Sequence, residues 1–124
     1  MARWAVLLLL VLGAWGCTKS VPGIEPPVGS PVLVFGELKS RERVSLERAH
    51  AAALGALREL GYKITTDDKD AVAANVIGYG FGDTRANVKL KWVNRKITEV
   101  AIRVGTVGDE QASRLILERM RARY

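Results

Sequence analysis

The segment between residues 86 and 104 constrains the fold most strongly, because apolar and polar side chains alternate along almost its whole length. Residues 86–92 and residues 98–104 each follow a period of two, and a polar connection lies between them. Successive side chains of a strand point to opposite sides of a sheet, so this period predicts two strands with one buried face each. The sequence therefore predicts an antiparallel hairpin with a three-residue loop at 94–96.

The apolar positions also predict the register of this hairpin. They meet on one face when Leu90 lies opposite Val100. The same register puts Lys91 opposite Glu99 on the other face, where a pair of opposite charges stabilises the sheet by up to about 1 kcal/mol.

Two further segments have the period of amphipathic helices. The first begins after Ser45, a good N-cap residue, and ends at Gly61, which suits the position just past a helix. The second begins after Asp109 and runs to about residue 123. The apolar stripes are Leu46, Ala49, Ala53, Leu54, Leu57 and Leu60 in the first helix, and Ser113, Ile116, Leu117, Met120 and Tyr124 in the second. Each stripe is expected to cover a sheet.

Three shorter segments, residues 32–38, 62–66 and 71–79, complete the predicted sheet. Gly36 interrupts the first and is expected at a bulge or at a close approach of two backbones. In the third, the side chains expected to face the core are Val72, Ala74 and Val76. Connections are expected at residues 39–44, 67–70 and 80–85.

These elements predict an α+β fold in the order β-α-β-β-β-β-α. Consecutive strands with short turns indicate a mainly antiparallel sheet of four to five strands, and the two helices are expected on one face of it, as a two-layer sandwich. The expected core consists of Leu54, Leu57, Val76, Val88, Leu90, Val100, Ile102, Ile116 and Met120.

Residues 1–16 predict an export leader rather than a part of the folded domain. Arg3 precedes an apolar run that is shorter than the roughly 20 residues of a membrane-spanning helix but has the length found in signal peptides. The run ends in Gly16-Cys17 and resembles a bacterial lipoprotein signal, which implies cleavage between these two residues and lipid attachment at Cys17. Small residues at positions 14 and 16 also fit ordinary secretory cleavage.

The lipoprotein resemblance implies a membrane anchor, because two or three acyl chains on one residue bind a bilayer firmly. The same resemblance implies the outer membrane, with the protein facing the periplasm, because Thr18 rather than an aspartate follows Cys17. All four prolines fall between residues 22 and 31. We therefore expect a lipidated cysteine and a proline-rich tether over 17–31, and a single small domain over 32–124.

Composition and spacing offer no catalytic constellation. The net charge of +6 becomes +5 when the one charge of Arg3 is removed with the leader, and an exported protein does not meet nucleic acid. The chain has one cysteine and one histidine, His50, which has no acidic or cysteine partner near it in the sequence and is expected to be a packed or boundary residue. The acidic run at 67–70 lacks the glycine and the distant glutamate of a calcium loop. We expect no metal, no cofactor and no enzyme activity.

The end of the chain resembles a known family. The run Ile-Arg-Val-Gly at 102–105, followed by Gly108-Asp109-Glu110 and Ser113, is similar to a family of small bacterial lipoproteins that is classed as a domain of unknown function. The resemblance covers residues 32–120. It implies the fold outline and the anchor, and it implies no activity.

The function expected from these features is that of an envelope lipoprotein whose domain has a structural or protein-interaction role. The uncovered sheet face would supply the contact surface, with Tyr79, Lys89, Lys91 and Arg103 on it. The alternative is a small-ligand module that binds anionic lipid or cell-wall fragments, which needs a concave pocket.

Overall fold

The computed structural model describes residues 27–124 of the chain. The strands are β1 (Val32–Val34), β2 (Glu37–Glu42), β3 (Lys63–Lys69), β4 (Ala73–Tyr79), β5 (Arg85–Asn94) and β6 (Ile97–Val104). The helices are α2 (Leu46–Glu59) and α3 (Glu110–Arg121), and a short 3-10 turn, η3 (Phe81–Asp83), joins β4 to β5. The predicted leader over 1–16 and Cys17 lie outside the described residues.

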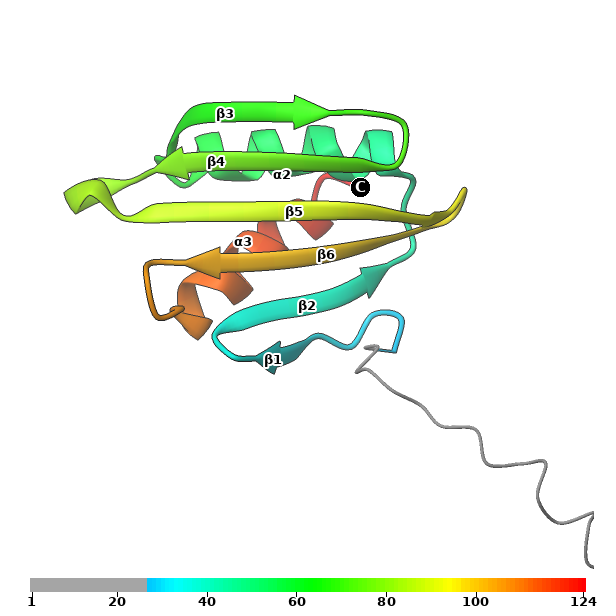
Figure 1. Ribbon diagram of the computed structural model, residues 1–124, viewed down its shortest axis with the longest axis horizontal. Helices are drawn as coiled ribbons and strands as arrows, with labels where there is room; N and C mark the ends of the chain where they lie inside the picture. The colour runs from blue at the N-terminus through cyan, green and yellow to red at the C-terminus, as the bar shows by residue number, and fades with distance from the viewer. Residues whose placement is uncertain (1–26) are drawn as a thin grey trace, which may run out of the picture.

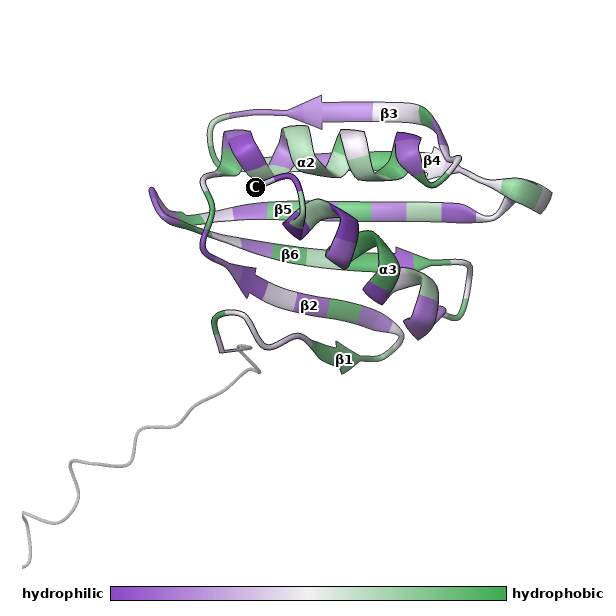
Figure 2. Ribbon diagram, turned by 180° about the vertical axis from the view of Figure 1, so that it is seen from behind, coloured by the Kyte–Doolittle hydropathy of each residue, from purple (hydrophilic) through white to green (hydrophobic). Residues whose placement is uncertain are grey.

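All six strands of this part of the chain form one antiparallel sheet in the order β1-β2-β6-β5-β4-β3. Both helices pack on the same face of the sheet, and the other face carries no element (Figures 1 and 2). The predicted α+β, two-layer architecture is confirmed, with six strands where four to five were expected.

The β5–β6 hairpin has the predicted register. Leu90 lies opposite Val100 and Lys91 lies opposite Glu99, although the carboxylate of Glu99 forms its ion pair with Arg41 rather than with Lys91. The loop is one residue shorter than expected, because β5 continues to Asn94 and a bulge between Trp92 and Asn94 takes up the extra residue.

The additional strand comes from the segment 32–44, where one strand and a charged connection were expected. Phe35 and Gly36 have φ angles of 49° and 80°, so the chain reverses there and β2 returns beside β1. The prediction missed β2 because the side chains that it buries after Leu38 are Ser40 and Glu42. Because these buried side chains are polar, the sequence of β2 does not alternate between apolar and polar residues.

β3 is also longer than predicted, since it runs through Asp67 and Asp68 to Lys69, where a turn was expected. A bulge between Ile64 and Thr66 shifts its register against β4. β3 is one edge of the sheet and the three-residue β1 is the other. An edge strand has one exposed side, which explains why polar residues form it.

The two helices begin and end as the sequence predicts. Ser45 caps α2 by accepting a hydrogen bond from the backbone N–H of Arg48, and Asp109 caps α3 in the same way through Ala112. Gly61, with φ of 89°, lets the chain leave α2 in a left-handed turn. None of the helices in the described residues is long and apolar enough to span a membrane.

The core lies between the helices and the sheet. Eight of the nine predicted core residues are buried there: Leu57, Val76, Val88, Leu90, Val100, Ile102, Ile116 and Met120. Leu54 is partly buried at the margin of the core. Val72 is not a core residue, because it precedes β4 in the β3–β4 turn and is 57% exposed.

The connections gather at two ends of the sheet (Figure 1). We call one the entry end: it holds residues 27–30, the β3–β4 turn and the β5–β6 turn. The other, the loop end, holds the β1–β2 turn, η3 and the β6–α3 loop. At the loop end Gly36 and Gly108 pack backbone to backbone, so the close approach expected at Gly36 is confirmed.

Candidate functional site

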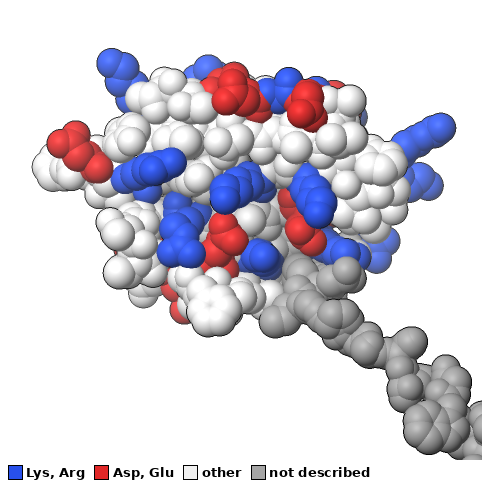
Figure 3. Space-filling model, in the orientation of Figure 1, with Lys and Arg blue, Asp and Glu red and all other residues white. Residues whose placement is uncertain are grey.

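The uncovered face of the sheet is the broadest surface on which this domain could bind a partner. Its side chains alternate with those of the core, and they include Glu37, Lys39, Asn75, Ile77, Tyr79, Asn87, Lys89, Lys91, Glu99 and Arg103. Figure 3 shows Lys and Arg side chains over the central strands of this face, with Asp and Glu side chains among them. The surface therefore has mixed charge.

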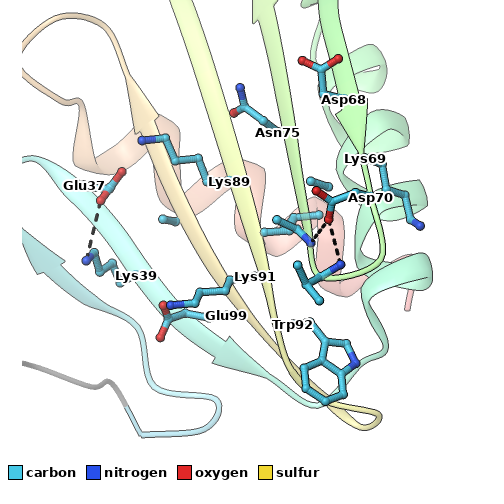
Figure 4. A pocket seen from close by; sticks show the side chains of 15 residues that line it. Glu37, Lys39, Asp68, Lys69, Asp70, Asn75, Lys89, Lys91, Trp92 and Glu99 are labelled. Atoms are coloured by element: carbon cyan, nitrogen blue, oxygen red, sulfur yellow. Dashed lines mark hydrogen bonds and ion pairs between the residues drawn. The ribbon is translucent and has the colours of Figure 1, made fainter.

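A groove of about 930 Å³ crosses this face towards the entry end. Small residues, among them Ala73 and Ala101, line it. Figure 4 shows Lys89, Lys91 and Trp92 among its other lining residues. The side-chain oxygen of Asn75, another lining residue, has no hydrogen-bond partner among the described residues. The groove thus combines apolar surface with four lysines and four carboxylates, namely Lys39, Lys69, Lys89, Lys91, Glu37, Asp68, Asp70 and Glu99.

Two of the four lysines that line the groove, Lys89 and Lys91, are available to a partner. The carboxylate of Glu99 lies 3.7 Å from Arg41, and that of Glu37 lies 4.0 Å from Lys39. Within residues 27–124, neither Lys89 nor Lys91 has a carboxylate within the 4.0 Å of an ion pair.

The four residues predicted for the contact face all lie on it, but they do not form one cluster. Lys89 and Lys91 line the groove, whereas Tyr79 ends β4 at the loop end. Arg103 donates hydrogen bonds to the backbone oxygens of Phe35, at 2.7 Å, and Thr106, at 3.5 Å. Arg103 therefore joins the β1–β2 turn to the β6–α3 loop, so its role in the described structure is to stabilise the fold.

A family model described as a protein of unknown function, DUF3568, matches residues 2–123. The chain belongs to the DUF3568 family. The family description carries no activity. No curated protein matches the chain.

The DUF3568 domain also contains a buried charge cluster that the sequence interpretation missed. Glu42 is 3% exposed and accepts two hydrogen bonds of 2.7 Å from Arg121, one on each carboxylate oxygen. Tyr124 donates to the same carboxylate at 3.1 Å, and the hydroxyl of Ser40 makes a further short hydrogen bond to it. This set joins β2 to α3 beneath the sheet.

The cluster also holds the point where the chain enters the domain. Arg121 donates to the backbone oxygen of Gly29 at 3.2 Å. The backbone N–H of Gly29 in turn donates to the oxygen of Arg41 at 2.7 Å, and Val28 forms an isolated bridge to the same residue. Residues 28 and 29 are therefore fastened to the edge of the folded domain.

Burial and hydrogen bonding act in opposite directions on Glu42. Burial alone would raise the pKa of its carboxyl, but the hydrogen bonds and charge of Arg121, with the hydrogen bonds of Ser40 and Tyr124, hold that pKa below its ordinary value of 4.5. Burial and the neighbouring carboxylate raise the pKa of Tyr124. Glu42 is therefore ionised and Tyr124 protonated at neutral pH.

Because the pKa of Glu42 is lowered in the folded state, the stability of the domain depends on pH in the acidic range. A carboxyl group with a lower pKa in the folded state contributes its stability above the unfolded pKa, near 4.5, and loses it as the pH falls towards the folded value. We expect the gap in Tm between the native protein and Glu42→Gln to narrow between pH 7 and pH 3. A gap that stays constant over this range would contradict the assignment.

His50 has a partner that the sequence did not reveal. The bulge in β3 turns Asp67 towards α2, and its carboxylate lies 2.6 Å from Nε2 of His50. His50 is mostly buried at the margin of the helix layer, as predicted, but it does have an acidic neighbour. Among residues 27–124, no group of three or more His, Cys, Asp or Glu side chains is arranged to hold a metal ion.

Proposed function

We propose that this protein is an envelope lipoprotein whose domain binds a protein partner through the uncovered face of its sheet, without catalysis. The leader over 1–16 would be removed before Cys17, and acyl chains on Cys17 would hold the protein in the outer membrane, facing the periplasm. The domain over 32–124 would then act near the bilayer as a docking module.

The observation that carries this proposal is the groove on the uncovered face. A six-stranded sheet with both helices on one side leaves its other side free, and that side has a hollow with unpaired lysines rather than a flat polar surface. Large apolar side chains are exposed at both ends of the sheet: Trp92 at the entry end, and Phe35 and Phe81 at the loop end. Phe35 is 92% and Phe81 99% exposed.

The anchor is tested by the intact mass of the protein purified from the membrane fraction of a bacterial host. We expect a chain that begins at Cys17 and carries acyl chains, and we expect Cys17→Ala to be released from the membrane or left unprocessed. An unmodified chain beginning at Cys17 would mean simple secretion.

The contact face is tested by photocrosslinking in the same host. A photoreactive amino acid at position 89 or 91 is expected to give a discrete crosslinked product, because both positions line the groove. Position 118 is the matched control, since Glu118 is exposed on α3, on the opposite side of the molecule. Equal products from all three positions, or none from 89 and 91, would contradict the proposal.

The groove also favours a second candidate, the binding of a small anionic ligand such as a cell-wall fragment or a lipid headgroup. The ammonium groups of Lys89 and Lys91 suit an anion, and Trp92 lines the same groove. Under this alternative, soluble cell-wall fragments would bind the purified protein in calorimetry. Lys89→Glu combined with Lys91→Glu would abolish the binding heat.

A further inference from the structure

We infer that the entry end of the sheet docks on the anionic headgroups of the bilayer that holds the anchor. The inference rests on the proposed acylation of Cys17. It adds to the proposed function a fixed orientation, with the entry end on the lipid and the loop end away from it.

The first argument is the reach of the anchor. Arg41 and Arg121 fasten residues 28 and 29 to the entry end, so the chain joins the domain there. Ten positions separate Cys17 from Pro27. At about 3.1 Å per residue, an extended proline-rich segment of that length reaches ~31 Å. The anchor therefore keeps the entry end close to the lipid surface.

The second argument is an exposed apolar pair at this end. Trp92 is 43% exposed and Val72 is 57% exposed. The backbone N–H of Trp92 donates to the oxygen of Val72 at 2.8 Å, so the two residues are neighbours. Tryptophan is enriched at the boundary between lipid and water, where its ring lies at the level of the headgroups.

The third argument is charge. Arg95 and Lys96 form the β5–β6 turn, three residues after Trp92, and Arg43 follows β2 at the same end. All three are exposed, and within the described part of the chain none makes an ion pair. Figure 3 shows Lys and Arg side chains extending from this end of the molecule. Basic residues beside a membrane are attracted to anionic headgroups.

Two acidic residues near this end are paired with cations of their own. Glu47 lies 3.6 Å from Lys69, and Glu99 lies 3.7 Å from Arg41. The carboxylate of Asp70 accepts hydrogen bonds from two backbone N–H groups of its own turn. Asp68 lies near the end of β3, beside the same turn, so the carboxylates of Asp68 and Asp70 offset part of the charge of Arg43, Arg95 and Lys96.

Trp92 makes the inference measurable, because the other two tryptophans lie in the predicted leader. The acylated protein is reconstituted into vesicles of phosphatidylcholine alone, or mixed with phosphatidylglycerol, each with a brominated phospholipid as quencher. With phosphatidylglycerol we expect a blue shift of the Trp92 emission and a loss of its intensity. Both effects should disappear in 1 M salt, where charges are screened beyond about 3 Å.

Charge reversal separates docking from mere proximity. Arg95→Glu with Lys96→Glu is expected to restore the unquenched emission, although the protein stays in the vesicle. The matched control is Lys63→Glu with Arg85→Glu, which changes the charge equally at the loop end and should leave quenching intact. Quenching that is absent, or that both double variants abolish equally, overturns the inference alone. Purified protein without acyl chains overturns the proposed function as well.

Discussion

Replacing Arg121 with methionine is expected to lower the free energy of unfolding by about 3 kcal/mol, the lower end of the range for breaking a buried ion pair. The substitution leaves the carboxylate of Glu42 charged, almost fully buried and without its two hydrogen bonds from the guanidinium. The low end applies because the side chain of Arg121 is itself 38% exposed. For a domain of this size the loss corresponds to a fall in Tm of roughly 12 °C or more, measured by thermal unfolding at pH 7.

A double variant identifies the cause of that loss. Glu42→Gln removes the charge and keeps an acceptor for Tyr124 and Ser40, so Glu42→Gln combined with Arg121→Met should be more stable than Arg121→Met alone. A double variant whose loss equals the sum of the two single losses would show that the pair is not coupled.

Gly108→Ala is expected to destabilise the domain by roughly 3 kcal/mol or more, through two effects. Its φ of 93° is a left-handed conformation that costs an alanine about 1–2 kcal/mol. An added Cβ would also lie 2.2 Å from the backbone oxygen of Gly36, so the two loops would have to separate. Overpacking of this kind costs a further 1–3 kcal/mol or so. The midpoint of unfolding in denaturant measures the sum.

Gly105→Ala is the matched control, since it lies in the same loop with φ of 78° and has no heavy atom within 4 Å of the added Cβ. It should show the conformational cost alone, about 1–2 kcal/mol. If the two variants lose the same stability, the contact between Gly36 and Gly108 does not contribute to it.

The fold could be predicted from the sequence in those segments whose buried side chains are apolar. The alternation over residues 86–104 predicts the register of β5 with β6, including Lys91 opposite Glu99, and the capping residues predict both helix starts. β2 escaped prediction because it buries Glu42, whose partner Arg121 is 79 positions away in the chain. A pattern of hydrophobicity cannot reveal a charge neutralised by such a distant residue.

The candidate site was predictable to a similar extent. Once a strand's core face is known, the opposite face follows, so Lys89 and Lys91 could be placed correctly from the sequence alone. The bonds of Arg103 could not be predicted, because its carbonyl partner in Phe35 lies 68 positions away. The groove could not be predicted from the sequence either, because it depends on how β3 and the β3–β4 turn approach the central strands.

The two edges of the sheet have a consequence for how copies of this protein meet one another. An unpaired edge strand is a template on which a second chain can add a strand, and crowding on a surface would favour such addition. Here β1 offers only three residues, while β3 has a bulge after Ile64 and ends in Asp67, Asp68 and Lys69. The shortness of β1, together with the bulge and the charged residues of β3, opposes edge-to-edge aggregation. Neighbouring copies are therefore expected to remain separate domains.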